Sequence, residues 1–557
     1  MGRLDFVVMA VFAILIFAIG LTFTRVSSKN GNAFFEAGGA TPWWINGLSL
    51  FISYFSAGTF VVWGSIAYKS GLVANAIQLT MAISGLIVTF FIAARWKRSG
   101  AGTPAEYIGN RFGSKTKQFY TYLTLLLSLF TTGAVLYPVG KMVYVATPFS
   151  LNACIIVIGL IIILYTAAGG LWAVLVTDVI QFVVLSAAVV IVIPISLAQI
   201  GGFQNLISKA PPHFFEPVNS DYTFGFMLAF VVYQTFYIGG NWSYVQRYTT
   251  VASPKQSKKV AGIFTILYFI CPVIWMLPPM IYHIINPDLK GLQTEDAYMM
   301  LIQKVMPAGL IGLVLAGMVS ATSSKANTTI NMAATVFAQD IYKNILRPVA
   351  QEKETIWIAR LFTLIFGIGT ILIAIWIPSA GGIVEVVLST ASIAGGALFA
   401  PIIWSLFSNR QTGFSVVMAT ITALTINLFF KVLGPKLLLL TLSRTVETSL
   451  GMGIPIAVLL VFECYYFFYG KGTYINKVTN DSPAAFITIQ ADNDAREQNN
   501  FGIRVIAISM LVVGAGIFML GVVAEKYGMI VLIVGSIIIT AALFILRYIN
   551  KNRKLQS

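Results

Sequence analysis

A lysine stands among small hydroxyl residues at positions 320–331, where the sequence reads SATSSKANTTIN. Apolar sequence flanks this stretch on both sides, GLIGLVLAGMV before it and MAATVFA after it, as in a membrane helix. The ammonium of Lys325 carries three hydrogen-bond donors and no acceptor, so it cannot coordinate a cation. An unpaired charge at the centre of a membrane helix costs at least about 2.5–3.5 kcal/mol. We therefore expect Lys325 to have partners and to bear on how the protein handles an ion.

Two other apolar stretches have polar, glycine-containing centres. Residues 56–59 read SAGT, and residues 234–241 read QTFYIGGN. Interrupted helices leave backbone N–H and C=O groups free to hold an ion or a solute near the middle of the membrane. Glycines that merely let helices pack closely are the alternative explanation. Because both centres also carry hydroxyl or amide groups, we expect them to contribute Ser56, Gly58, Thr59, Gln234, Gly239 and Asn241 to a solute site.

The elements that position these residues are transmembrane helices. Of the 557 residues, 57% are hydrophobic and 10% are charged, against about a quarter charged in a soluble domain. Continuous apolar runs of about 20 residues match the thickness of a bilayer core, and their lack of alternation argues against a β-barrel. The predicted spans are 5–24, 43–68, 72–95, 118–146, 153–171, 172–197, 223–242, 261–283, 306–337, 357–378, 383–407, 414–432, 451–469, 503–523 and 527–547.

The basic residues predict the orientation. With the N-terminus outside, 25 of the 36 lysines and arginines fall on inner segments or inner helix ends and 8 on outer segments. This asymmetry follows the positive-inside rule and places the C-terminus in the cytoplasm. The net charge of +16 therefore indicates a membrane topology and a lipid partner, with no nucleic acid.

The sequence resembles the sodium:solute symporters. The strongest motif is YTAAGGLWAVLVTDVIQ at residues 165–181, which departs from the family's YTxxGGLxAVxWTDxxQ only at Val176. Three shorter stretches support it: NAFFEAGG at 32–39, VQR at 245–247 and QDIY at 339–342. The resemblance implies an all-α polytopic transporter in the plasma membrane of a bacterium, with no enzymatic activity and no cofactor.

The resemblance also implies a LeuT-like core of two inverted five-helix repeats, working by alternating access. One membrane domain, 1–557, would then comprise an N-terminal helix and inner loop (5–42), the core (43–407, with repeats 43–197 and 223–407), and extra helices (408–557) with an inner loop at 470–502.

The family's cation site is carried over residue by residue. Ile52 and Phe55 fall where relatives offer backbone carbonyls to sodium, and Ala321 falls at the third carbonyl position. Ser324 matches the first hydroxyl ligand, whereas Lys325 stands where the second is expected. Asp178 matches the aspartate thought to help the cation leave toward the cytoplasm.

Three interpretations of Lys325 remain open. Its ammonium could replace the sodium ion and donate to the carbonyls of Ile52, Phe55 and Ala321, which would make transport sodium-independent. It could instead exchange a proton, which would make the protein a proton-coupled symporter. In the third interpretation the register differs, Ser320 or Ser323 serves an ordinary sodium site, and Lys325 points toward the cytoplasm. We favour the first two over ordinary sodium symport, so the coupling ion, sodium or proton, stays open.

The solute is expected to be a small polar organic molecule. In sugar-transporting relatives polar side chains surround the sugar, and the resemblance implies solute contacts at the matching Thr59, Gln78 and Gln234. Tyr237 matches the aromatic gate of the family, which stacks on the solute. No arginine lies in the middle of the second, third or seventh span to clamp a carboxylate, and Lys141 is expected to extend toward the outer surface. A sugar, a polyol or a zwitterion is therefore favoured over a strong acid. A transporter-like receptor, which binds solute without accumulating it, is a further alternative, and the sequence makes no prediction of oligomeric state.

Overall fold

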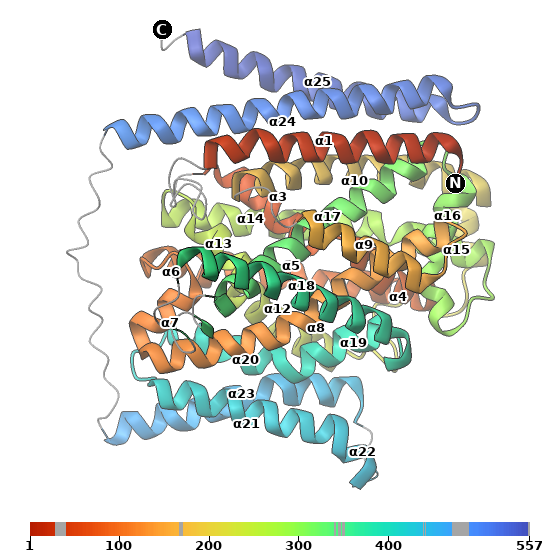
Figure 1. Ribbon diagram of the computed structural model, residues 1–557. Coiled ribbons are helices and arrows are strands. Elements are labelled where there is room, and N and C mark those ends of the chain that lie inside the picture. The colour runs from red at the N-terminus through yellow and green to blue at the C-terminus, as the bar shows by residue number, and fades with distance from the viewer. Residues whose placement is uncertain are drawn as a thin grey trace.

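The computed structural model describes residues 1–27, 41–165, 171–338, 341–342, 347, 351–437, 439, 442–469 and 489–554, and within these ranges it is helical, with no strand. Figure 1 shows long helices lying roughly parallel to one another in a bundle. The longer helices are α1 (Arg3–Ser27), α3 (Trp43–Tyr54), α5 (Val73–Ile87), α8 (Ser114–Ala146), α9 (Leu151–Tyr165), α10 (Leu171–Ile200), α12 (Phe224–Gly240), α14 (Pro254–Trp275), α17 (Leu310–Val336), α18 (Glu352–Trp376), α20 (Gly396–Ser405), α21 (Gly413–Leu428), α23 (Arg444–Tyr469), α24 (Ile489–Val523) and α25 (Gly528–Lys554).

Shorter helical elements complete the chain. They are the π-helices η2 (Thr59–Trp63), η3 (Val88–Ile92), η7 (Ala391–Gly395) and η8 (Phe429–Leu433), the 3-10 helices η4 (Gly291–Asp296) and η6 (Ile377–Ala380), and the α-helices α4 (Gly64–Ser70), α6 (Ala93–Arg98), α7 (Pro104–Phe112), α11 (Phe203–Lys209), α13 (Trp242–Thr249), α15 (Leu277–Ile285), α16 (Ala297–Val305), α19 (Ile383–Thr390) and α22 (Gly434–Leu437).

The helices confirm a polytopic membrane protein. Eleven helices in the described ranges are long and apolar enough to span a bilayer, and α3 with η2 and α4 makes a twelfth that bends by 51°. Three further predicted spans correspond to shorter or more polar helices, α9, α12 and α17. The predicted number of about 15 spans is thus slightly higher than the 11 or 12 helices that pass by length and apolarity, and it is broadly consistent with them.

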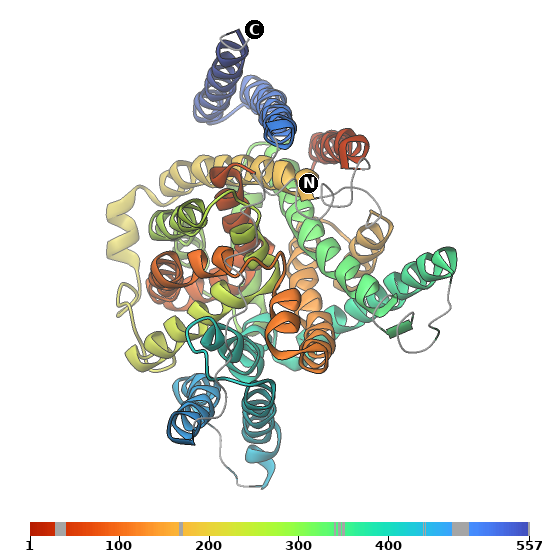
Figure 2. The ribbon, with the colours of Figure 1, turned by 90° about the vertical axis from the view of Figure 1, so that its left-hand side faces the viewer.

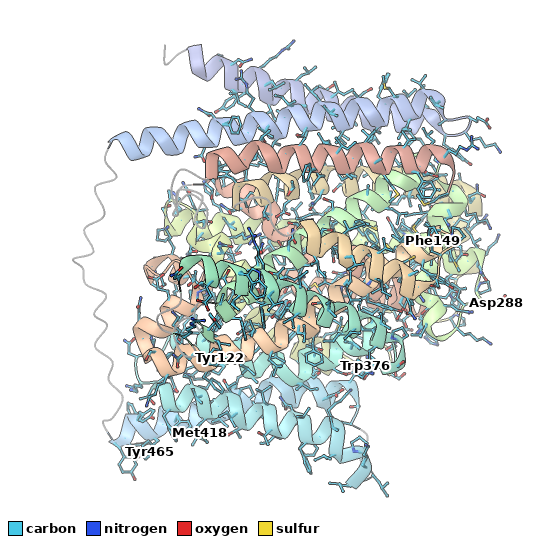
Figure 3. The ribbon with its side chains drawn as sticks, in the orientation of Figure 1. Tyr122, Phe149, Asp288, Trp376, Met418 and Tyr465 are labelled. Carbon is cyan, nitrogen blue, oxygen red and sulfur yellow. The ribbon has the colours of Figure 1, made fainter. Side chains whose placement is uncertain are left out.

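The extra helices pack on opposite sides of the core (Figure 2). The hairpin of α24 and α25 packs on α10, beside α1, whereas α21 and α23 pack on α12 and α20. Figure 3 shows Phe149 and Asp288 at one end of the bundle and Tyr465 at the other. We call these the outer end and the inner end, after the orientation that the basic residues predict.

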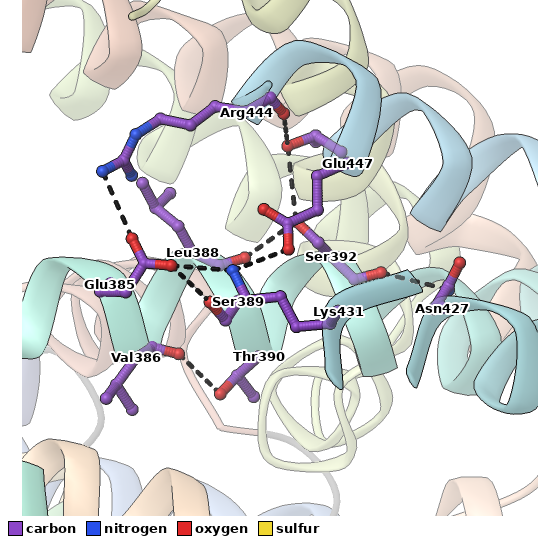
Figure 4. Close-up of polar contacts among 11 residues, drawn as sticks. Glu385, Val386, Leu388, Ser389, Thr390, Ser392, Asn427, Lys431, Arg444 and Glu447 are labelled. Carbon is purple, nitrogen blue, oxygen red and sulfur yellow. Dashed lines mark hydrogen bonds and ion pairs between the residues drawn. The ribbon is translucent and has the colours of Figure 1, made fainter. Parts of the chain in front are cut away.

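Glu385 belongs to a cluster of four charged side chains outside the cavity described below (Figure 4). Its carboxylate pairs with Lys431 at 2.8 Å and with Arg444 at 3.3 Å, and Lys431 also pairs with Glu447 at 2.8 Å. These contacts join α19 of the core to η8 and α23. Glu385 and Lys431 therefore link the core to its peripheral helices.

Asp5 attaches the first helix to α17, which carries residues 320–331. Its Oδ1 accepts hydrogen bonds from the backbone N–H groups of Gly309 (2.7 Å) and Gly312 (3.1 Å), and Asp5 is 1% exposed. Gly312 permits the contact, since a Cβ there would lie 2.1 Å from the Asp5 carbonyl oxygen. A carboxylate at a helix N-terminus satisfies unpaired N–H groups and interacts favourably with the helix dipole.

We expect Asp5→Asn to destabilise the protein by about 1–2 kcal/mol, because the charged cap of α17 is lost. The measurement is the thermal unfolding midpoint of the purified protein in detergent. Asp221→Asn removes an exposed carboxylate and serves as the matched control. Equal midpoints for Asp5→Asn and the wild-type protein would contradict the capping role.

Candidate functional site

The first helix interruption lies between α3 and η2, at residues 55–58. Phe55 is extended, with φ −88° and ψ 111°, and the helix ends before it. The Thr59 hydroxyl accepts a hydrogen bond from the Ser56 N–H (3.2 Å) and donates to the Tyr54 carbonyl (3.3 Å). The Gly58 N–H donates to the Ser56 hydroxyl at 3.3 Å. These hydroxyls satisfy backbone groups that the broken helix would otherwise leave unpaired within the membrane.

The second interruption lies between α12 and α13, at Asn241. Its backbone is extended, with φ −64° and ψ 128°, and its side-chain oxygen accepts a hydrogen bond from the Ser243 N–H at 3.0 Å. The side chain therefore caps α13 as an Asn N-cap does. Both interruptions that the sequence predicts are present, and in each a short polar side chain satisfies the freed backbone.

Asp178 on α10 connects both broken helices. Its carboxylate accepts hydrogen bonds from Ser49 of α3 (2.5 Å) and from Ser324 of α17. Arg247 of α13 lies 3.8 Å from the same carboxylate and also donates to the Ser49 hydroxyl at 3.3 Å. Asp178 and Arg247 are 3% and 4% exposed. We call these four residues the Asp178 network.

A cavity of about 270 Å³ lies between the two interruptions and α17. Ten of the predicted site residues line it: Ile52, Ser56, Gly58, Thr59, Asp178, Tyr237, Asn241, Ala321, Ser324 and Lys325. Its wall includes residues of α13 and of the first turns of α10. The structure thus brings the expected solute and cation residues to one shared space, which we call the central cavity.

Four predicted site residues do not line the central cavity. Gln234 accepts a hydrogen bond from the Tyr54 hydroxyl at 3.0 Å, and Gly239 accepts one from the Trp96 indole at 2.7 Å. Phe55 stacks on Trp275, and Gln78 is 1% exposed with neither amide atom hydrogen-bonded in the described part of the chain. In this conformation Gln234, Gly239 and Phe55 serve packing and helix contacts.

Lys325 lines the cavity, and its ammonium has no hydrogen-bond or ion-pair partner among the residues that the structure describes. Its own backbone carbonyl accepts a hydrogen bond from Thr329 at 3.1 Å, as in regular helix. The expected contacts from its ammonium to the carbonyls of Ile52 and Ala321, or to Ser324, are not made in this conformation. The described protein groups therefore do not supply the partner that a lysine ammonium needs within the membrane.

Lys141 is buried rather than extended to the outer surface, so the expectation that it would reach water is wrong. It is 7% exposed and lies 3.3 Å from Asp296 and 4.0 Å from Glu295. The Glu295 carboxylate also accepts hydrogen bonds from the Tyr137 hydroxyl (2.7 Å) and the Ile383 N–H (3.1 Å). We call Tyr137, Lys141, Glu295 and Asp296 the outer closure, because they tie α8, η4 and α19 together near the outer end.

Sequence reasoning missed much of the cavity wall. Hydroxyls on one face of α8 line it, as do several rings and one arginine: Thr124, Ser128, Thr131, Thr132, Trp63, Tyr233, Trp242, Tyr244, Phe399 and Arg247. The hydroxyls of α8 recur at helical spacing within an apolar span, a signal that could have been found. The rings carry no such signal, since aromatic residues are common throughout the sequence.

Parts of the supporting motifs lie outside the described residues. These are 32–39, 166–170 and 339–340, together with 470–488 of the predicted inner loop. The described remainder of the main motif is the start of α10, which carries Asp178 and Gln181. The Gln181 amide donates to the Ser320 hydroxyl at 2.8 Å, so this motif contacts the stretch at 320–331.

Comparison with known proteins gives a family match over most of the chain. The model of the sodium:solute symporter family matches residues 34–423. The sodium/myo-inositol cotransporter 2 of Bos taurus is 28% identical over 417 residues, 67% of this chain and 61% of that protein. The sodium/glucose cotransporter of Vibrio parahaemolyticus is 25% identical over 462 residues, 77% of this chain and 85% of that protein.

A solved structure shares the fold. It is described as a substrate-bound outward-open state of a Na+-coupled sialic acid symporter, and it matches with a TM-score of 0.67 and 22% identity over 83% of this chain and 98% of that one. This likeness confirms the LeuT-like architecture. The first curated relative is longer than the match, since the matched region spans about three-fifths of it.

We expect Asp178→Asn to destabilise the protein by about 3–5 kcal/mol, because it leaves the buried Arg247 guanidinium without its counter-charge. Asp178→Asn combined with Arg247→Gln should recover part of that loss. The measurement is a double-mutant cycle on the free energy of unfolding in detergent, with Asp288→Asn as an exposed control. Strictly additive effects would show that the two residues are not coupled.

Asp296 should make stability depend on pH. Burial raises its pKa to about 6, against the lowering effect of Lys141. Because the folded protein then binds this proton more tightly than the unfolded chain, stability falls as the pH rises from about 4 to about 6.

We expect Asp296→Asn to remove this contribution. The unfolding midpoint of the variant, relative to wild type, should therefore be more favourable at pH 7 than at pH 4.5. Asp288→Asn, an exposed carboxylate of the same loop, should show no such difference. A variant whose midpoint differs from wild type by the same amount at both pH values would contradict the assignment.

Proposed function

The chain belongs to the sodium:solute symporter family, and from this premise we propose that it is a secondary transporter of a small polar organic solute. It acts by alternating access in the plasma membrane of a bacterium, with its N-terminus outside and its C-terminus in the cytoplasm. The observation that carries the proposal is the central cavity, which lies between two interrupted helices and contains hydroxyls and aromatic rings. Residues 43–197 and 223–407 would form the two repeats, each with one interrupted helix.

The geometry supports an inward-facing conformation. The central cavity is lined by Arg247 and other residues of α13, which follows the predicted span 223–242 on its cytoplasmic side. On the outer side, Phe60 stacks on Tyr298, with ring centroids 3.9 Å apart, and the outer closure joins α8, η4 and α19. Alternating access then requires the residues of the outer closure to move apart. At the same time, the cavity must narrow around the Asp178 network.

Coupling is the second part of the proposal. Lys325 stands where the family resemblance places a sodium ligand, and an ammonium cannot coordinate sodium. We therefore propose that transport is sodium-independent, either driven by protons or following the solute gradient. The solute is a sugar, a polyol or a zwitterion, which suits a cavity wall with many hydroxyls. Ordinary sodium symport is the competing proposal, and the names of the cotransporters above favour it.

Uptake into proteoliposomes tests the transport itself. Pools of radiolabelled sugars, polyols and amino acids are offered under a sodium gradient, a proton gradient and neither. We expect uptake that is unchanged by the removal of sodium, and a response to the proton gradient would identify proton symport. Uptake that requires sodium would place Lys325 off the ion site. Binding without uptake would indicate a receptor instead of a transporter.

Lys325→Ser should change cation dependence instead of abolishing folding, because it restores a hydroxyl beside Ser324. We expect uptake by this variant, at a solute concentration high enough to saturate binding, to become stimulated by sodium, measured as the initial rate with and without a sodium gradient. Lys304→Ser, which removes an exposed lysine from α16, is the matched control. A Lys325→Ser variant that folds, transports and ignores sodium would contradict the role of this position.

A further inference from the structure

The charges on the cavity wall do not balance. In the described residues, three charged side chains line the central cavity: Asp178, Arg247 and Lys325. Asp178 and Arg247 form an ion pair at 3.8 Å and are both nearly fully buried. Lys325 adds one positive charge for which the wall provides no counter-charge. The central cavity therefore carries a net charge of about +1.

The Lys325 ammonium is free to meet a ligand. The other cations that lie deep in the protein are engaged: Arg247 donates to the Ser243 carbonyl (2.8 Å) and to Ser49, and Lys141 pairs with two carboxylates. Lys325 has no such contact among the described residues, although it faces the cavity. Because an unpaired charge at this depth is costly, a solute that supplies the partner gains affinity from it.

The imbalance selects the charge of the solute group that meets Lys325. A neutral sugar would leave Lys325 unpaired, and a phosphate monoester, with a charge of about −2, would replace the excess of positive charge by an excess of negative charge. A single carboxylate pairs one to one with the Lys325 ammonium. The remaining wall suits the rest of such a molecule. The hydroxyls of Thr124, Ser128 and Thr131 can form hydrogen bonds with its polar groups, and rings such as Trp63 can stack on its apolar faces.

We propose that the solute carries one carboxylate, and that this carboxylate forms an ion pair with the ammonium of Lys325 in the central cavity. The proposal rests on the proposed transport function and revises its solute class: it keeps the zwitterion, excludes neutral sugars and polyols, and adds monoanionic organic acids. In a zwitterion, the ammonium group would face the aromatic side of the wall, where cation–π contacts are favourable.

The experiment compares matched pairs of acids and neutral analogues. Purified protein is screened by ligand-induced thermal stabilisation with proline, N-acetylproline and N-acetylprolinamide, glucuronate and glucose, gluconate and sorbitol, and nicotinate and nicotinamide. We expect stabilisation by at least one carboxylate and by none of the neutral partners. The same carboxylate is then titrated against Lys325→Met, Lys325→Arg and the exposed control Lys304→Met.

Lys325→Met should weaken binding of the carboxylate by roughly thirtyfold or more, as expected when one partner of a buried ion pair is removed. Lys325→Arg keeps the charge and should retain most of the affinity, and Lys304→Met should bind as wild type does. A panel in which no carboxylate binds, neutral partners that bind as well as the acids, or unchanged affinity in a folded Lys325→Met variant would each overturn the proposal. Carboxylate binding that depends on Lys325 without uptake would contradict the transport function and leave the ion pair standing.

Discussion

The cost of a charge inside a membrane shapes this molecule more than any other constraint. An ion in hydrocarbon needs a counter-charge or hydrogen-bonding groups, or the helix that carries it is destabilised. Asp178 and Arg247 satisfy one another between α10 and α13, and Lys141 is paired with Glu295 and Asp296 near the outer end. Each pair joins elements that are distant in sequence, so the pairing of charges also holds the bundle in this conformation.

The same constraint explains the local geometry of the interruptions. A broken helix exposes backbone groups, and Ser56, Thr59 and Asn241 satisfy them with side-chain oxygens. The broken helices then converge on Asp178, through Ser49 on one side and Arg247 on the other. Lys325 also lines the cavity beside this network, and its ammonium has no protein partner in the described chain. This unpaired ammonium gives the cavity wall its excess positive charge.

The sequence predicts the features that depend on local composition. Apolar run lengths give the helices, and the polar glycine-containing centres give both interruptions, because these signals are contiguous in the chain. Pairings between distant segments leave no such signal. Arg247 was quoted only as part of a motif, and Lys141 was expected to reach water, since neither Asp178 nor Glu295 is near them in sequence.

The solute residues were only partly predictable for a similar reason. Gln78 and Gln234 match polar positions of relatives, yet neither lines the cavity in this conformation, and Gln234 accepts a hydrogen bond from Tyr54 instead. The hydroxyl face of α8 contributes instead. Its spacing was visible in the sequence, but which of many apolar helices would face the cavity depends on packing.

The central claim is that Lys325, at the position of a sodium ligand, makes transport independent of sodium. The most direct measurement is equilibrium binding of radioactive sodium to the purified protein, compared between wild type and Lys325→Ser and competed with unlabelled sodium. The account predicts no displaceable sodium on the wild-type protein and displaceable sodium on the variant. Stoichiometric, displaceable sodium on the wild-type protein would contradict it, because an ammonium and a sodium ion cannot occupy the same site.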